Sequence, residues 1–149
     1  MQIEPIAVEQ TYPLRHRILR VGRPLESCYF VGDKDPESIH LGAFENGTLV
    51  GILSALPNPY PENQMDAFQI RGMAVAEKAR KLGVATALLK SFESYFLQQT
   101  AKSYIWLNAR INIQDLYLKN GFSPVGSPFL IEPIGIHQRF FKSLSHESS

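Results

Sequence analysis

One stretch of the chain, Phe68 to Gln99, constrains the fold most strongly, because a strand pattern and a helix pattern meet there across a short basic turn. Residues 67–75 alternate between two faces, which is typical of a β-strand. The two predicted faces are Phe68, Ile70, Gly72 and Ala74, and opposite them Gln69, Arg71, Met73 and Val75. We therefore expect a central strand that leads through a turn into a helix.

The segment after the turn has the periodicity of an amphipathic helix. Apolar side chains recur at steps of three and four residues, and Lys90, Glu93 and Gln98 fall between them. This spacing places the apolar side chains on one buried stripe. The stripe consists of Ala85, Leu88, Leu89, Phe92, Tyr95 and Phe96.

The turn between these two elements has the properties of a phosphate-binding site. The first N–H groups of a helix have no acceptor within the helix, and with the positive end of the helix dipole they attract phosphate oxygens. Gly83 lets such oxygens approach the main chain without meeting a Cβ, Ala85 keeps the first helical turn slim, and Arg80 and Lys81 add positive charge. The sequence therefore predicts a phosphate-bearing cofactor, although it contains neither G-x-x-x-x-G-K-S/T nor G-x-G-x-x-G.

Two segments resemble signatures of the GNAT superfamily of N-acetyltransferases. The turn is similar to its cofactor-binding motif, Q/R-x-x-G-x-G/A, through Arg80, Gly83 and Ala85. Residues 112–122 resemble a second signature, in which an asparagine precedes a helix that ends in F/L/Y-Y-x-K-x-G-F/Y. The matching residues there are Asn112, Leu116, Tyr117, Lys119, Gly121 and Phe122. The distance between the two segments is also that of the family.

The resemblance implies an α/β (α+β) fold with one N-acetyltransferase-like domain over residues 1–149. We expect a mixed central sheet of about six or seven strands, flanked by helices, with one parallel pair that splays apart. The cofactor-binding core would span residues 67–122, and the acceptor side would include the N-terminal helix and loop, residues 8–37. The implied cosubstrate is acetyl-CoA, whose pantetheine arm would bond to the main chain of the central strand. The implied cofactor contacts are Met73, Val75, Arg80, Lys81, Gly83, Val84, Ala85, Thr86 and Asn112.

The resemblance also implies a catalytic role for Tyr117, which matches the position that often protonates the leaving thiolate. The general base stays open. Its candidates are Glu132, His137, His40 and a water held by Gln69. Residues 129–137 loosely resemble an F-x-x-x-G-I-P-H segment of some bacterial members but lack its proline, so the resemblance assigns no role to Glu132 or His137.

The N-terminal third predicts a helix over residues 8–20 and a long loop over residues 22–37. Leu14, Ile18 and Val21 are spaced to face inward. We expect a mostly solvated face, rather than a substrate clamp, for Arg15, Arg17 and Arg20. The loop carries carboxylates that could attract a cationic amine, although surface solubility accounts for most of them. They are Glu26, Asp33, Asp35 and Glu37.

The remaining elements are expected as further strands and one short helix. Residues 38–44 and 48–56 predict a hairpin around Asn46-Gly47. Residues 103–108 predict a strand parallel to the central one, since a helix connects the two. Residues 112–120 predict a helix ended by Gly121, and two more strands are expected in residues 123–126 and 137–144.

Composition limits the function further. The 149 residues carry 15 basic and 14 acidic side chains, for a net charge of +1, which predicts no nucleic-acid partner and no anionic membrane surface. Cys28 is the only cysteine, so an intrachain disulfide is excluded and no metal site is expected. The absence of an apolar leader or long apolar run makes a cytoplasmic location the default. A homodimer is common in the family, but no apolar stripe identifies an interface.

The leading hypothesis is an N-acetyltransferase that moves an acetyl group from acetyl-CoA to a primary amine of a small molecule or peptide by direct attack. The alternative is a non-catalytic acyl-CoA-binding or regulatory module, which would keep Arg80, Gly83 and Ala85 but need no acid, base or acceptor pocket. Tyr117 and the loop over residues 22–37, which we expect to be ordered, favour the enzyme.

Overall fold

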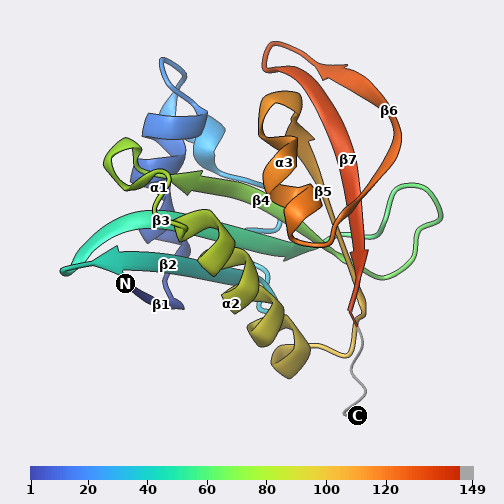
Figure 1. Ribbon diagram of the computed structural model, residues 1–149, viewed down its shortest axis with the longest axis horizontal. Coiled ribbons are helices and arrows are strands. Elements are labelled where there is room, and N and C mark those ends of the chain that lie inside the picture. The colour runs from blue at the N-terminus through green and yellow to red at the C-terminus, as the bar shows by residue number, and fades with distance from the viewer. Residues whose placement is uncertain (145–149) are drawn as a thin grey trace.

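The computed structural model describes residues 1–144, and these build one seven-stranded sheet with the order β1-β2-β3-β4-β5-β7-β6 (Figure 1). The strands are β1 (Gln2–Pro5), β2 (Ile39–Glu45), β3 (Thr48–Pro57), β4 (Phe68–Val75), β5 (Tyr104–Arg110), β6 (Ser123–Ile131) and β7 (Gly135–Ser143). The mixed sheet is confirmed, with β4 and β5 as its parallel pair. The sequence pattern missed β1, which pairs with β2 at the sheet edge.

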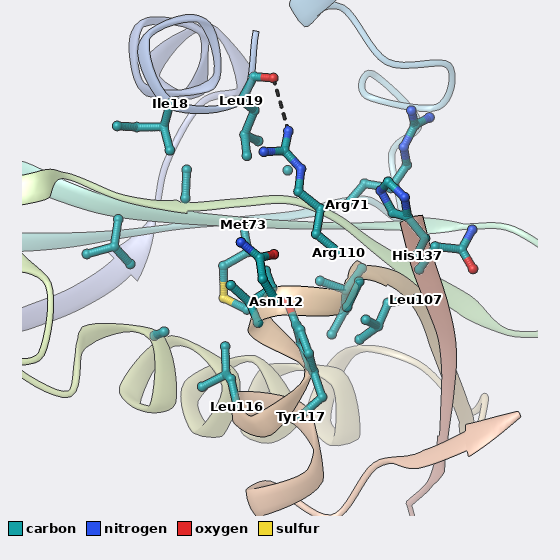
Figure 2. A pocket seen from close by; sticks show the side chains of 18 of the residues that line it. Ile18, Leu19, Arg71, Met73, Leu107, Arg110, Asn112, Leu116, Tyr117 and His137 are labelled. Carbon is teal, nitrogen blue, oxygen red and sulfur yellow. Dashed lines mark hydrogen bonds between the residues drawn. The ribbon is translucent and has the colours of Figure 1, made fainter. Parts of the chain in front are cut away.

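Helices cover both faces of the sheet. On one face lie α2 (Val84–Gln99) and α3 (Gln114–Lys119), and on the other lies the N-terminal helical segment (Figure 2). That segment is irregular: a 3-10 turn η1 (Val8–Thr11) leads into α1 (Tyr12–Leu14) and a π-helical turn η2 (Arg15–Leu19). The remaining short helices are η3 (Leu25–Cys28), η4 (Glu77–Ala79) and η5 (Ile111–Ile113).

The predicted hairpin joins β2 to β3 through Asn46 and Gly47. Their φ angles of 49° and 81° give the type I′ geometry that matches the twist of the paired strands. The hairpin provides the antiparallel partner of β4, because β3 pairs with β4 along most of its length.

The core helix α2 packs its predicted stripe on this part of the sheet. Leu88, Leu89, Phe92 and Phe96 are fully buried, and each such side chain contributes about 1.5–3 kcal/mol by leaving water. Gly51 on β3 allows the close approach of the first turn, since a Cβ there would lie 2.7 Å from Val84 Cγ1. The beginning of α2 is thereby fixed beside the end of β4, where Val75 pairs with Gly51.

The parallel pair separates almost as soon as it forms. The register of β4 and β5 contains only Phe68 with Ile105 and Gln69 with Trp106. Beyond Gln69, β4 pairs on one side with β3, and β5 pairs with β7. Main-chain groups of β4 therefore face an opening between the two strands.

A β-bulge in β4 corrects the alternation expected from the sequence. The register shifts where Ala74 pairs with Ile52 and Arg71 pairs with Ser54, and Gly72 has a φ of +70°. Paired residues share a face of the sheet, so Met73 and Val75 lie on the α2 face together with Ile70. The sequence placed Met73 and Ile70 on opposite faces, because a strict period of two does not include the extra residue.

The N-terminal segment corrects a second expectation. Arg15, predicted on a solvated face, has no exposed surface, whereas Val21, predicted to face inward, is 71% exposed. The π-helical turn at η2 shifts the rotation of the side chains from the regular helical period. No helix within residues 1–144 is long and apolar enough to cross a membrane.

Candidate active site

The opening between β4 and β5 is the mouth of a cavity of about 860 Å³. Its walls come from η2, β4, the turn before α2, β5, the η5–α3 segment and the β6–β7 hairpin. Figure 2 shows this cavity with Ile18 and Leu19 on one side of the sheet and Met73, Leu116 and Tyr117 on the other. Segments far apart in the sequence thus meet where the sheet separates.

One end of the cavity is formed by the basic turn before α2. Arg80, Lys81 and Ala85 line it, and Arg80 Nε donates a hydrogen bond to Val75 O at 3.3 Å. Gly83 is the N-cap of α2 with a φ of +79°, and no side chain caps the helix. A Cβ at Gly83 would meet nothing within 4 Å. The first N–H groups of α2 are consequently free of a side-chain acceptor and open to a ligand.

Three predicted contact residues of this turn do not line the cavity with their side chains. Val84 is only 2% exposed and packs against β3. Gly83 and Thr86 also lie outside the lining. These residues can therefore contribute to the site through main-chain N–H groups at the start of α2.

Asn112 of η5 and Tyr117 of α3 line the cavity from the segment that follows β5. Met73 and Val75 of β4 line it as well, so the predicted strand contacts and the predicted acid face one space. The Tyr117 ring packs against Phe122 and Phe140 at centroid distances of 5.7 Å, and burial raises the pKa of its hydroxyl. Within the described residues, this hydroxyl has no hydrogen-bond partner. It therefore remains protonated at neutral pH and is available to donate a proton.

Two of the four base candidates line the cavity. His137 is buried, and its Nδ1 lies 2.8 Å from Gly135 O. Because a carbonyl oxygen only accepts, Nδ1 carries the hydrogen and Nε2 keeps a free lone pair. Gln69 also lines the cavity, and its Oε1 accepts a hydrogen bond from Asn58 Nδ2.

The other two candidates lie elsewhere. His40 contacts Ser54 Oγ through Nδ1 and Asp33 O through Nε2, so both ring nitrogens are occupied. Its role is to support β2 and β3 beneath the loop. Glu132 is exposed in the β6–β7 hairpin and does not line the cavity.

A buried ion pair supports the side of the cavity formed by η2 and the loop over residues 22–37. Arg15 donates to Asp33 through both terminal nitrogens, at 2.7 and 2.9 Å, and also to Ser54 Oγ and Cys28 O. Asp33 Oδ2 accepts a further bond from the N–H of Phe30. The long loop is thus fixed against η2 and β3, and Asp33 is unavailable to attract an amine.

Several residues that line the cavity were missed at the level of sequence. Arg20, expected mostly at a solvated face, lines the cavity, as do Phe30, Arg71 and Arg110. Only the position of Arg71 in the predicted central strand could have indicated this, since a charged side chain there must face a solvated space or a partner. Residues 1–144 contain no group of three or more His, Cys, Asp or Glu side chains that could hold a metal ion.

Comparison with known proteins places these features in a family. Residues 5–122 match the family model described as "Acetyltransferase (GNAT) family". The chain is also 37% identical over 145 residues to the uncharacterized N-acetyltransferase YitI of Bacillus subtilis (strain 168), and the match covers 97% of each chain.

Solved structures show the same fold at low sequence identity. An aminoglycoside 6'-N-acetyltransferase complexed with coenzyme A aligns over 100% of both chains with a TM-score of 0.77 and 16% identity. An acyl-CoA N-acyltransferase from Pseudomonas aeruginosa aligns with a TM-score of 0.73 and 18% identity, covering 95% of this chain and 99% of that one. At such identities the likeness concerns the fold.

Proposed function

The chain belongs to the GNAT family of acetyltransferases, and on that premise we propose that it moves an acetyl group from acetyl-CoA to a primary amine of a small molecule or peptide. The observation that carries the proposal is the cavity itself. It joins an uncapped helix N-terminus, a stretch of β4 that is unpaired on the side of β5, and the Tyr117 hydroxyl in one space.

The chemistry of the cavity fits acetyl-CoA. Free N–H groups at the start of α2, with Arg80 and Lys81, suit the pyrophosphate. The main chain of Met73 and Val75 suits the amides of the pantetheine arm, which would pair with β4 as an added strand does. Asn112 lines the cavity beside α3 and supplies a further polar contact.

Bound acetyl-CoA supplies an acetyl thioester. In the transfer the amine nitrogen bonds to the acetyl carbon and the C–S bond breaks, while the amine loses a proton and the thiolate gains one. Neutral pH lies about three units below the pKa of a lysine-like amine, so deprotonation of the amine requires roughly 4 kcal/mol. The pKa of a thiol resembling cysteine differs from neutral pH by only about one or two units, roughly 2 kcal/mol. Deprotonation of the amine by the base therefore requires more free energy than protonation of the thiolate by the acid.

We assign the base to His137 and the acid to Tyr117. The free Nε2 of His137 accepts the proton of the amine, directly or through one water oriented by Gln69. The Tyr117 hydroxyl donates to the sulfur on the α3 side of the opening. Replacing His137 by Ala should lower kcat by about 10²–10⁴-fold without weakening acetyl-CoA binding, and unchanged turnover would remove His137 from this role.

The cofactor site is tested by calorimetric titration with acetyl-CoA, with ADP as the reference ligand. We expect saturable one-to-one binding that is much tighter for acetyl-CoA. Gly83→Asp places bulk and negative charge at the proposed phosphate position and should weaken binding at least tenfold. Gly47→Asp is the matched control, because Gly47 has a φ of +81° and equally open surroundings in a distant hairpin. Equal affinities of the two variants would refute the assignment.

The alternative of a non-catalytic acyl-CoA-binding module differs in one measurable respect. It predicts tight acetyl-CoA binding with no amine-dependent release of coenzyme A. A panel of small amines and peptides with free N-termini, followed by thiol detection, separates the two. The enzyme is supported by release above the background hydrolysis rate that disappears in the His137→Ala variant.

A further inference from the structure

The acceptor end of the cavity is rich in guanidinium groups, and we propose that the acceptor amine carries an anionic group, a carboxylate or phosphate, that Arg20, Arg71 and Arg110 bind. This inference rests on the proposed acetyltransferase function and specifies its substrate class. It also differs from a possibility that the sequence left open, in which acidic loop residues could attract a cationic amine.

Two shared contacts bring the three guanidinium groups to one place. Arg20 Nη1 and Arg110 Nη2 both approach Leu19 O, at 3.1 and 3.4 Å. Arg71 and Arg20 both lie over the Phe30 ring, at 4.3 and 5.4 Å from its centroid. Figure 2 shows Arg71 and Arg110 on the side of the sheet where Leu19 lies.

These three side chains have no anionic partner in residues 1–144. Each is half-buried, and none takes part in an ion pair. Burial lowers the pKa of both Arg20 and Arg71, and the neighbouring arginines lower it further. Removing guanidinium groups from water without a carboxylate is unfavourable, so an incoming anion gains charge-assisted hydrogen bonds at little additional desolvation.

The carboxylates near these three arginines do not pair with their positive charges. Asp33 forms its ion pair with Arg15 behind the Phe30 ring, and Arg15 lies over the same ring at 4.1 Å. The other carboxylates of the loop lie outside the cavity lining. Within residues 1–144, Asp115 is the single carboxylate that lines the cavity, and it belongs to α3, whereas the guanidinium groups come from the end of η2, from β4 and from β5.

The geometry also positions the amine. Arg71 and His137 both line the cavity, and they extend to the same side of the sheet (Figure 2). An anion held by the arginines therefore places an amine on the same molecule within the part of the cavity that His137 faces. A polycationic acceptor would instead meet like charge at this end.

The test compares matched amines that differ only in the anionic group. One pair is L-lysine and 1,5-diaminopentane, and the other is O-phosphoethanolamine and ethanolamine. We expect kcat/KM for release of coenzyme A to be at least tenfold higher for the anionic member of one pair. A preference for L-lysine would indicate a carboxylate, and a preference for O-phosphoethanolamine would indicate a phosphate. Equal or better turnover of the members without the anionic group in both pairs would overturn the proposal.

Variants locate the anion. Arg71→Gln should raise the KM for the favoured anionic amine at least tenfold more than it raises the KM for its partner, and Arg71→Lys should restore part of the difference. The control is Arg17→Gln, at an exposed arginine of η2 that does not line the cavity, and this variant should change neither KM. If Arg71→Gln weakens acetyl-CoA binding as much as amine binding, the arginines serve the phosphates of the cofactor and the proposal fails.

Direct binding keeps this inference separable from the proposed function. The four amines are titrated by calorimetry into the protein saturated with coenzyme A, where no transfer takes place. If no amine is turned over but an anionic member binds in an Arg71-dependent manner, the catalytic proposal fails and the anion site stands. If no anionic member binds, the anion site is refuted whatever the turnover.

Discussion

Replacement of Gly72 by Ala should destabilise the protein through two separable effects. Gly72 has a φ of +70° in the β4 bulge, and an alanine in this conformation loses about 1–2 kcal/mol. Its Cβ would also lie 2.9 Å from Phe30 Cε2 and 3.1 Å from Arg15 Nε. Neither group can move freely, because Arg15 is held by its bonds to Asp33 and the Phe30 ring is packed between guanidinium groups.

The overlap adds about 1–3 kcal/mol, the usual range for overpacking in a filled core. The total loss in the free energy of unfolding is therefore about 2–5 kcal/mol, reduced by about 0.4–1 kcal/mol because alanine restricts the unfolded chain. Gly126→Ala isolates the first effect, since Gly126 has the same φ of +70° and no atom within 4 Å of the added Cβ. The difference between the two variants should then be about 1–3 kcal/mol.

The assay is urea denaturation of both variants, with midpoints compared at a common m value. Thermal midpoints should differ by about 2–4 °C per kcal/mol. Displacement of the Phe30 ring should also raise the KM for the amine in Gly72→Ala alone. If Gly72→Ala is no less stable than Gly126→Ala, the side chains of Arg15 and Phe30 can shift at little cost in free energy. The packing argument would then be wrong.

Further predictions concern the proposed acid, the buried ion pair and the pH dependence of stability. Tyr117→Phe should lower turnover roughly tenfold to a thousandfold and leave acetyl-CoA affinity unchanged in calorimetry. Asp33→Asn leaves the charge of Arg15 unpaired and should lower the free energy of unfolding by about 3–5 kcal/mol, whereas Asp35→Asn on the exposed part of the loop should lower it by about 1 kcal/mol at most. Burial lowers the pKa of His40, so the unfolded chain binds the proton first and stability should fall as the pH drops through about 6.5. His40→Asn should make this fall shallower in chemical denaturation at several pH values.

Local patterns were sufficient to predict the central elements. The strand before Arg80, the helix after Gly83 and the Asn46-Gly47 turn each follow from residues close in sequence, and the structure confirms all three. The parallel pair followed from the helical connection between its strands. The chemistry of the turn was equally local, because it depends on a helix N-terminus.

The side of the cavity formed by η2 and the loop over residues 22–37 could not be predicted, because its contacts join distant segments. Arg15 and Asp33 are 18 positions apart and become partners only when the loop folds over η2. The register of β4 depends on a bulge at Gly72. The glycine permits this bulge but does not predict it, since other glycines of the chain lie in turns. The proposed base shows the same limit: His137 is distinguished from His40 by the hydrogen bonds of their ring nitrogens, and the sequence contains no signal for these.

The brief pairing of β4 with β5 has a consequence for the dynamics of the molecule. Two residue pairs join a four-stranded unit, β1 to β4, to a three-stranded unit, β5 to β7. Such units can separate by partial opening, and native-state hydrogen exchange detects this as amides that exchange below the global unfolding free energy. A ligand that bridges β4 and β5 and binds only the closed form raises the opening free energy by about 2.7 kcal/mol at a hundredfold excess over Kd. Acetyl-CoA would then slow amide exchange in both units at once. The seven-stranded sheet would open less often as two separate units, because the bound substrate supplies contacts between β4 and β5 that the backbone lacks.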